Sequence, residues 1–364
     1  MVISVAYSLT QCAHPVPGGT GVAALELLTA LKAEADPVEV VTVGALPVRR
    51  GGSLELPTPS KRYPLPYPAL YELWNNTKMG ALDQIVPEAD VAHLTVAFCP
   101  ERRTVPQVCT VHDIFPFTYS EMLTKRGARV LQAGLHRVIE RADIIVSPTQ
   151  ATKEELVAQG VDPSRIRVVP LGATAQEFTD EQLQRIRERF CMLDDFVLFA
   201  GTVEPRKNLD ILLSAMEVVG NEVQLVLVGP TGWGEIADRV PGMRSDRVRV
   251  LGKQSRRDLL GLMTAASAVC MPSHAEGFGL PALEAMAQGT PVIHSHCAAL
   301  TEVVGSTGQR VAADDAAGWG AAMTAFVNET AKSSELGSLA RERASGFTWD
   351  ATAASMRSVY EELV

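Results

Sequence analysis

The sequence predicts an α/β protein built from two doubly wound, Rossmann-like domains. Short apolar runs, which are typical of buried strands, alternate with helical patterns along most of the chain. Such alternation indicates βαβ units and parallel sheets. The length of 364 residues allows two domains of about 150–200 residues each. An apolar content of 46% is sufficient for sizeable cores.

The N-terminal half carries the first series of elements. Strands are predicted at 2–7, 38–43, 91–94, 107–111 and 144–147, with helices at 21–33 and 125–141. Residues 49–76 differ because they are rich in Pro and Gly and contain several aromatic residues. A segment of this kind is predicted to be a long loop, either functional or mobile.

The C-terminal half repeats the alternation. Strands are predicted at 196–200, 224–228, 248–251, 268–271 and 291–294, with helices at 209–218, 256–265 and 281–288. The boundary between the halves is placed near residues 171–173. A charged stretch at 176–189 leads from there to the first strand of the second domain.

Charge and cysteine usage exclude some classes of function. The net charge of −9 argues against nucleic acid as the main partner. The six cysteines are scattered and form no C-x-x-C pair, so a zinc or redox motif has little support and a reducing, cytoplasmic location is expected. The N-terminus lacks the basic region of a signal peptide, and no run of 18 apolar residues predicts a membrane span.

Residues 274–290 carry the most informative motif. Glu276 and Glu284 are separated by seven residues, and Gly277 and Gly279 follow the first acid. Pro281 suits the first turn of a helix, and a glycine-rich loop that opens a helix is an anion site. The two acids are suited to accept hydrogen bonds from hydroxyl groups. The segment therefore indicates a ligand with both phosphate and hydroxyls, such as a nucleotide sugar.

Residues 276–292 resemble the signature E-G-F-G-L-P-x-L-E-A-M-A-x-G-x-P-V of retaining glycosyltransferases with the GT-B fold, family 4. Residues 201–209, G-T-V-E-P-R-K-N-L, resemble the donor-diphosphate loop of that family. Residues 111–113 resemble a strand end that faces the donor sugar, and residues 17–21 resemble its glycine loop. The resemblance implies two domains facing across a cleft. Residues 1–172 would form the acceptor side, residues 173–345 the donor side, and residues 346–364 a helix that crosses back.

The resemblance also implies roles for the donor-side residues. Glu276 would face the donor sugar's hydroxyls, and Glu284 would bind the ribose. Further donor contacts would come from Gly277, Phe278, Gly279 and Leu280, and from Gly229 and Leu251, which end two strands near the base.

Lys207 aligns with the family's phosphate-binding lysine. The family's arginine usually follows the first glycine of its loop, where this chain has Thr202. Arg206 is thus a neighbour of the usual arginine position. Two cations at a helix start oppose the helix dipole unless an anion lies between them, and a diphosphate would be such an anion. Because no D-x-D motif occurs, no metal is expected, and no cofactor besides the nucleotide diphosphate sugar.

On the acceptor side, Gly18 and Gly19 either form a tight strand–helix turn or let the backbone approach the donor's phosphate or the acceptor. The resemblance implies that His112 contacts the donor sugar near the reacting centre, and that Asp113 orients it or binds the acceptor. Three aromatic residues either bind an acceptor's sugar rings or lipid, or simply pack: Tyr63, Tyr67 and Trp74.

Two helices leave further alternatives open. Thr149 either caps the helix that follows it or belongs to the ligand cleft. The helix predicted at 125–141 has a basic face, which is either solvated or in contact with an anionic membrane. Its members are Lys125, Arg126, Arg129, Arg137 and Arg141.

The predicted function is transfer of a hexose, with retention, from a nucleotide diphosphate sugar to a hydroxyl of a sugar, a glycolipid or a small molecule. Mannose is favoured because the sequence E-P-R-K-N resembles bacterial mannosyltransferase-like members. The alternatives are a UDP-sugar-dependent transferase, a sugar-phosphate synthase or epimerase, and a non-catalytic nucleotide-sugar-binding protein. The predicted location is the cytoplasm, with peripheral association at the inner membrane face left open.

Overall fold

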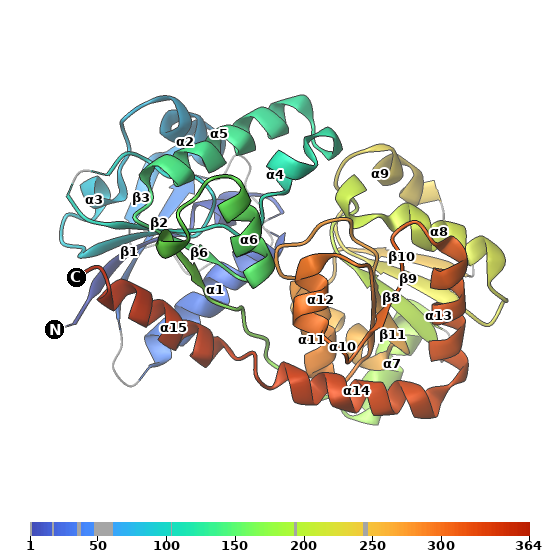
Figure 1. The fold of residues 1–364 in the computed structure, drawn as a ribbon. Coiled ribbons are helices and arrows are strands. Elements are labelled where there is room, and N and C mark those ends of the chain that lie inside the picture. Colours follow the sequence, from blue (N-terminus) through green and yellow to red (C-terminus); the bar gives the residue numbers. More distant parts are fainter. Residues whose placement is uncertain are drawn as a thin grey trace. The chain divides into compact units, whose positions relative to one another are not determined.

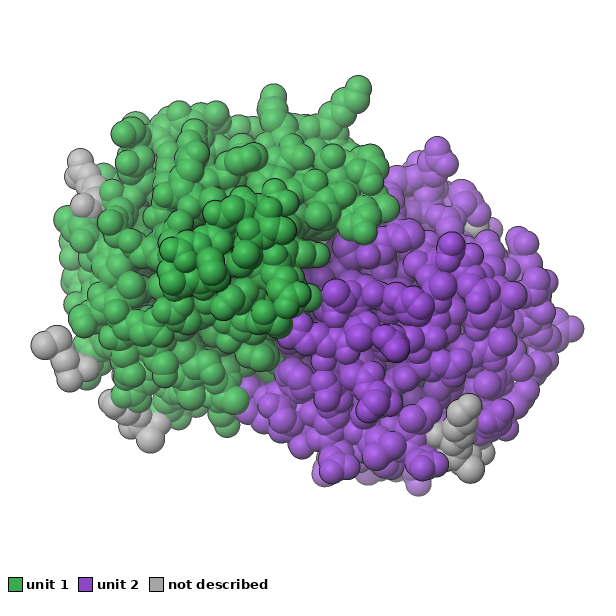
Figure 2. All heavy atoms as spheres, viewed as in Figure 1, with its two compact units in different colours: residues 1–172, 349–364 green, residues 173–348 purple. Residues whose placement is uncertain are grey.

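The chain divides into two compact units (Figures 1 and 2). One comprises residues 1–172 with 349–364, and the other comprises residues 173–348. The computed structural model describes residues 2–16, 18–34, 38–46, 61–102, 104–192, 195–242 and 247–364. The first part of the segment predicted as a long loop, residues 49–60, therefore lies outside the described residues.

The first unit contains a seven-stranded parallel sheet in the order β3-β2-β1-β4-β5-β6-β7. The chain runs outward from β1 to β3, then returns to place β4 beside β1. In sheets of this type, ligands bind at the carboxyl ends of the strands near such a reversal. The strands are β1 (Ser4–Ser8), β2 (Glu39–Leu46), β3 (Lys61–Pro66), β4 (Val91–Leu94), β5 (Gln107–Thr110), β6 (Ile144–Ser147) and β7 (Ile166–Val168).

Helices connect these strands, and two of them pack against each other on one face. α5 is amphipathic and buries Gly134, Leu135 and Val138, and it contacts α2. The helices are α1 (Gly18–Ala33), α2 (Tyr67–Asn76), α3 (Leu82–Ile85), α4 (Phe115–Thr118), α5 (Lys125–Arg141), α6 (Gln150–Ala158) and α15 (Trp349–Glu361), with short 3-10 turns η1 (Thr10–Ala13), η2 (Ser120–Met122) and η3 (Pro163–Arg165).

The loop prediction is wrong for residues 61–76, which form β3 and α2. Proline misled the interpretation. β3 is an edge strand, where Pro64 and Pro66 do not interrupt a ladder on both sides. Pro68 lies in the first turn of α2, where a missing N–H costs little. All three prolines are compatible with regular structure at these particular positions.

The last helix, α15, belongs to the first unit and packs against α1. A buried hydrogen bond of 2.7 Å joins His93 Nδ1 in β4 to the Tyr360 hydroxyl in α15. The Thr352 hydroxyl donates to the Pro170 carbonyl at 2.8 Å, and Arg167 pairs with Glu362 at 2.7 Å. Polar contacts therefore fix α15 along much of its length.

The second unit contains a six-stranded parallel sheet in the order β10-β9-β8-β11-β12-β13, with its reversal between β8 and β11. The strands are β8 (Phe196–Ala200), β9 (Gln224–Val228), β10 (Val248–Gly252), β11 (Ala268–Met271), β12 (Val292–His294) and β13 (Gln309–Arg310). The five strands and three helices predicted for this half are confirmed to within one residue at each end. The charged stretch at 176–189 is largely helical.

The helices of this unit cover its sheet (Figure 1). They are α7 (Asp180–Phe190), α8 (Leu209–Val218), α9 (Glu235–Arg239), α10 (Arg256–Ala265), α11 (Leu280–Gln288), α12 (Ala298–Val304), α13 (Ala316–Asn328) and α14 (Thr330–Ala344), with 3-10 turns η4 (Pro205–Lys207) and η5 (Val240–Gly242). Within the described ranges, no helix of either unit has the length and apolar content needed to cross a bilayer.

Candidate functional site

The loops that follow β8 and β11 meet at the reversal point of the second sheet. Arg206 and Lys207 lie in η4, a 3-10 turn that precedes α8. Asn208 adopts a left-handed conformation with φ of 52°, and its side-chain amide donates to the Pro272 carbonyl at 3.2 Å. The His274 N–H donates to the Arg206 carbonyl at 2.9 Å. These contacts attach the turn that carries both cations to the loop that carries Glu276.

Four charged side chains, each at most 13% exposed, form one cluster here. Lys207 Nζ lies 2.5 Å from Glu276 Oε1, and Arg206 Nη1 lies 3.2 Å from Glu276 Oε2. Arg206 Nη2 lies 2.7 Å from Glu204 Oε1. The Ser273 hydroxyl donates to Glu276 at 2.7 Å. The sequence predicted that a bound diphosphate would lie between the two cations. In the structure, the carboxylates of Glu204 and Glu276 supply the negative charge there.

The electrostatics of the cluster keep Glu276 ionised. Burial alone would raise the pKa of this carboxyl, but the charges of Lys207 and Arg206 outweigh burial and lower the pKa to about 2. Hydrogen bonds from Lys207 and Ser273 act in the same direction. Glu276 is therefore a permanent hydrogen-bond acceptor at neutral pH.

Glu284, the second acid of the motif, is buried in α11 and pairs with Arg256 at the start of α10. α11 begins after Gly279, in a left-handed conformation with φ of 85°, and ends at Gly289 with φ of 81°. A Cβ at Gly279 would lie 2.4 Å from Leu300 Cδ2. The predicted helix and its glycine boundaries are confirmed, and Leu280 is its first residue.

Three other residues predicted to contact the donor, Leu251, Phe278 and Gly229, make contacts within the protein. The Leu251 carbonyl accepts a hydrogen bond of 2.7 Å from the Gln254 side chain. Phe278 is buried and lies edge-to-face against Phe347, with ring centroids 6.1 Å apart. Gly229 has φ of 148°, and a Cβ there would lie 1.8 Å from the Gly201 carbonyl oxygen. Packing therefore requires glycine at 229 whether or not a ligand is bound.

In the first unit, Gly18 and Gly19 form the start of α1, which begins three residues earlier than predicted. Gly18 has φ of 62°, a conformation that favours glycine. A Cβ at either position would meet no atom of the described residues within 4 Å. At Gly19, therefore, packing within the described protein does not account for the absence of a side chain.

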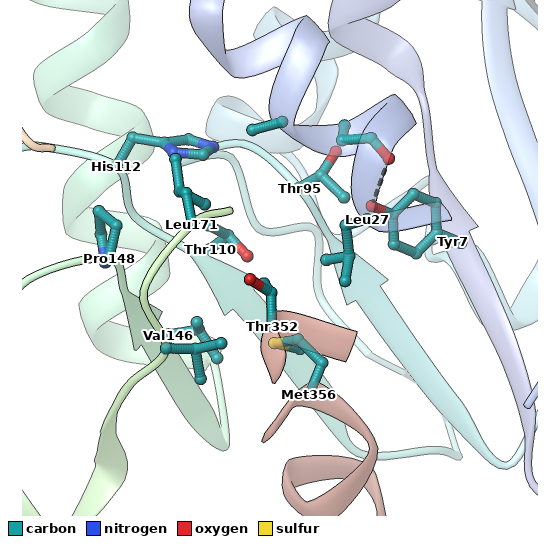
Figure 3. Close-up of a pocket in the computed structure, with 13 residues that line it drawn as sticks. Tyr7, Leu27, Thr95, Thr110, His112, Val146, Pro148, Leu171, Thr352 and Met356 are labelled. Carbon is teal, nitrogen blue, oxygen red and sulfur yellow. Dashed lines mark hydrogen bonds between the residues drawn. The ribbon is translucent and has the colours of Figure 1, made fainter. Parts of the chain in front are cut away.

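His112 follows β5 and is half-buried. Burial lowers the pKa of its imidazole to about 4, against the opposing effect of a hydrogen bond with the Thr95 backbone. The ring is therefore neutral at pH 7. His112 lines a cavity of about 20 Å³ together with Thr110 and Thr352, drawn in Figure 3. This volume is of the order of one water molecule.

Asp113, the next residue, is half-buried. Burial, and the charge of Asp113, raise the pKa of Glu155 in α6. Asp113 therefore lies close enough to α6 to influence a carboxylate there.

The aromatic residues separate into core and surface. Tyr63 and Trp74 are buried in the core of the first unit, and both donate to the Gly80 carbonyl, at 2.8 and 2.9 Å. Their assignment to an acceptor site is wrong, because core packing and Gly80 occupy both their rings and their polar atoms. Tyr67 is half-buried at the start of α2, with its ring 5.2 Å from that of His14.

The structure bears on the two alternatives left open for Thr149 and for the basic face of α5. Thr149 caps α6 by accepting from the Thr152 N–H at 3.1 Å, so the capping interpretation is confirmed. On the basic helix, Arg141 donates to the Trp74 and Cys99 carbonyls at 3.1 Å each. Arg137 donates to the Asn75 carbonyl at 3.0 Å. These two arginines attach α5 to neighbouring segments and do not form a purely solvated face.

Two family models match the chain. The model described as "Glycosyltransferase Family 4" matches residues 17–177, and the one described as "Glycosyl transferases group 1" matches residues 194–329. A D-inositol 3-phosphate glycosyltransferase of Xylanimonas cellulosilytica is 34% identical over 284 residues, which cover 72% of this chain and 67% of that protein. The chain belongs to glycosyltransferase family 4.

Another relative of this glycosyltransferase is an O-antigen chain mannosyltransferase B of Escherichia coli. It is 33% identical over 214 residues, which cover 55% of this chain and 56% of that protein. The chain thus spans little more than half of this second relative.

Solved structures confirm the fold of the glycosyltransferase. The HepE protein of Anabaena, solved in complex with UDP-glucose, matches with a TM-score of 0.74 and 17% identity over 99% of this chain and 100% of that one. A sucrose-phosphate synthase of Thermosynechococcus elongatus matches with a TM-score of 0.74 and 22% identity over 99% of both chains. The two Rossmann-like units are those of the GT-B fold.

Two charged residues of the site, Glu204 and Arg256, were not predicted from the sequence. Glu204 stands two positions before Arg206 in E-P-R-K-N, and an acid beside two bases was a signal for an ion pair. Arg256 is separated from Glu284 by 28 positions, and nothing in the local sequence distinguishes it from a solvated arginine at a helix start.

Proposed function

We propose that this glycosyltransferase moves a hexosyl group from a nucleoside diphosphate sugar to a hydroxyl acceptor, with retention of anomeric configuration. The observation that carries the proposal is the pairing of Glu276 with Lys207 and Arg206 at the carboxyl end of the sheet. The buried, ionised carboxylate can accept a hydrogen bond from a sugar hydroxyl, and the two cations beside it can bind phosphate. Such a combination fits a ligand with a diphosphate next to a sugar.

Lys207 would bind the donor's diphosphate. An incoming phosphate competes with Glu276 for the Lys207 ammonium, and the transfer of Nζ to the phosphate leaves Glu276 Oε1 available for a hydroxyl of the donor sugar. Arg206 is the second cation within reach of the same acid. Because protein cations can neutralise the leaving group, the proposed reaction uses no metal ion and no additional cofactor.

Glu284 would hold the ribose. Its carboxylate is buried and already paired with Arg256, so a ribose hydroxyl would join an existing ion pair. A carboxylate has about four lone-pair positions, which is enough to accept from Arg256 and from a hydroxyl together.

In the proposed reaction, the bond from the anomeric carbon to the diphosphate oxygen breaks as the acceptor oxygen bonds to the same face. The acceptor's proton passes to the leaving diphosphate, and Lys207 stabilises the negative charge that develops there. His112 would position a sugar hydroxyl near the reacting centre. Its neutral ring has both a donor and an acceptor nitrogen for this purpose.

The donor we favour is GDP-mannose. The sequence E-P-R-K-N and the E. coli mannosyltransferase relative support this choice. A UDP-sugar is the alternative, supported by the UDP-glucose complex of HepE. For the acceptor, the inositol phosphate relatives favour a small phosphorylated polyol as a second candidate beside sugars and glycolipids. We place the reaction in the cytoplasm, with the basic residues of α5 as a candidate contact with an anionic membrane face.

The first test is thermal unfolding of the wild type and of Glu284→Ala with GDP, UDP, ADP and dTDP, followed by their sugar forms. A ligand that binds the folded state alone raises the midpoint. A selective rise with GDP and GDP-mannose that is lost in Glu284→Ala supports the donor choice. A selective rise with UDP compounds overturns the donor and keeps the reaction class. No response to any nucleotide contradicts the proposal as a whole.

Retention is tested separately. Once a donor and an acceptor give turnover, NMR of the product before mutarotation reports the anomeric configuration. An inverted product would contradict the same-face reaction.

A further inference from the structure

Glu204 has no task in the function proposed above, yet its placement is strongly constrained. Its side chain is 6% exposed, and its Oε1 accepts from two atoms of Arg206, Nε at 3.1 Å and Nη2 at 2.7 Å. A charged side chain at this depth is costly unless it is paired. Glu204 therefore depends on Arg206 for its stability in this position.

Arg206 uses the rest of its guanidinium on the loop that carries Glu276. Its Nη1 donates to the Ala275 carbonyl at 2.7 Å and to Glu276 Oε2 at 3.2 Å. Contacts thus engage Nε, Nη1 and Nη2, and the planar fork of the group fixes their relative directions. Arg206 connects Glu204 on one loop with Ala275 and Glu276 on the other.

We propose that Glu204 and Arg206 form a clamp that positions Glu276, and that Lys207 alone of the two cations engages the donor's diphosphate. The proposal rests on the function proposed above and assigns separate tasks to two adjacent cations. Glu204 and Arg206 are positioning residues in this scheme. Neither touches the donor.

The cost of moving each cation favours this division. If Arg206 turned to a phosphate, the buried Glu204 would lose its charged partner, which is strongly destabilising. Among the residues that the structure describes, the Lys207 ammonium pairs with Glu276 alone. When Lys207 turns to a phosphate, Glu276 still has Arg206 and Ser273. Lys207 can therefore change partners without leaving a buried charge unpaired.

The net charge of the cluster determines whether a variant should bind a diphosphate more tightly or more weakly, and this direction can be tested. Its two acids and two bases cancel formally, so a diphosphate enters a neutral site. Glu204→Gln leaves a net positive charge and weakens the hold on Arg206, because an amide oxygen accepts less strongly than a carboxylate. We expect this variant to bind a nucleoside diphosphate at least as tightly as the wild type, with a kcat that is about 10- to 100-fold lower because Glu276 is held less firmly in place.

The experiment compares Glu204→Gln, Arg206→Lys and Lys207→Gln. Calorimetry gives the Kd for GDP and UDP, and turnover of the sugar form gives kcat and KM. Arg206→Lys keeps the charge but loses the planar fork, so we expect a lower kcat with a Kd within about threefold of the wild type. We expect Lys207→Gln to weaken the Kd at least about tenfold, since it removes a charged hydrogen bond to phosphate. Glu217→Gln changes an exposed acid in α8. It is the matched control and should change neither the Kd nor the kcat.

A general loss of structure cannot imitate the expected result, because it would not lower kcat while preserving or improving Kd. If Glu204→Gln does not fold, Arg206→Lys carries the same test. The clamp is overturned if Glu204→Gln or Arg206→Lys weakens the Kd as much as Lys207→Gln does, or if both leave kcat within twofold of the wild type. A wild type that binds neither nucleotide overturns the proposed function as well, which distinguishes the two failures.

Discussion

The α-carbon of Gly229 lies so close to the Gly201 carbonyl that a Cβ at 229 would be 1.8 Å from its oxygen. The contact joins the ends of two adjacent strands, where the Gly201 N–H also donates to the Val228 carbonyl at 2.9 Å. Both partners are main chain, so no side-chain rotation can relieve a clash. The spacing of these two strand ends sets where the loop with Arg206 and Lys207 begins.

Gly229→Ala should therefore lower the free energy of unfolding by at least about 2 kcal/mol, since the clash adds to the strain of a positive φ. Urea unfolding followed by circular dichroism measures this. Gly242→Ala is the control, because a Cβ there meets no atom of the described residues within 4 Å and should change the value by no more than about 1 kcal/mol. Equal effects of the two changes would contradict the close approach.

The stability of the protein should depend on pH through Glu276. Its folded pKa, about 2, lies below the ordinary value of 4.5 because Lys207 and Arg206 outweigh the effect of burial. Between these two values the unfolded chain binds the extra proton. The contribution of Glu276 is thus fully present above about pH 4.5 and is lost as pH falls toward about 2.

Glu276→Gln removes this contribution. Between pH 4.5 and 3, we expect the free energy of unfolding to fall less steeply in this variant than in the wild type, by up to about 1.4 kcal/mol per pH unit. Urea unfolding at pH 7, 4.5 and 3 measures both slopes. Parallel slopes would show that the pair with Lys207 does not lower the pKa of Glu276.

Local patterns were sufficient for much of this fold. The strands of the second sheet are continuous apolar runs, and α11 is bounded by Gly279 and Gly289, so both could be predicted from neighbouring residues. β3 and α2 could not, because the meaning of Pro64 and Pro66 depends on whether their strand lies at an edge of the sheet. That property belongs to the folded sheet and has no local signal.

Some residues of the candidate site could also be predicted from local sequence, and others could not. Glu276 and Lys207 could be predicted because each stands in a motif with a recognisable spacing. The clamp could not, since Arg206 and Glu276 are 70 positions apart and meet only because β8 and β11 are neighbours. The burial of Trp74 was equally hidden, because an aromatic residue in a proline-rich segment has the same local sequence whether it packs or binds a ligand.

Tyr360→Phe should loosen α15. The Tyr360 hydroxyl bonds to His93 Nδ1 at 2.7 Å, and Thr110 bonds to the other ring nitrogen at 2.8 Å. Burial, and then the charge of His112, lower the pKa of His93 to about 3, so the ring cannot gain a proton to compensate. Without the hydroxyl, a buried nitrogen loses its partner, which costs about 1–3 kcal/mol.

Hydrogen exchange of the α15 amides and urea unfolding would measure this loss. Glu362→Gln is the control, because it breaks an ion pair with Arg167 whose side chains are 34% and 42% exposed. Exposed pairs contribute about 0–1 kcal/mol. A larger effect from Glu362→Gln than from Tyr360→Phe would place the attachment of α15 at its exposed end.

Tyr63→Phe and Tyr67→Phe are the same chemical change in two environments. The Tyr63 hydroxyl is buried and donates to the Gly80 carbonyl, which also accepts from Trp74. The carbonyl therefore keeps one donor when Tyr63 loses its hydroxyl, and the loss should be about 0.5–1.5 kcal/mol, the net value of one hydrogen bond. Tyr67 is half-buried, so its change should cost less than about 0.5 kcal/mol. Urea unfolding of both variants measures the difference. If Tyr67→Phe is as destabilising as Tyr63→Phe, the Tyr67 hydroxyl already has a task in the folded protein, and this result counts against Tyr67 as an acceptor contact.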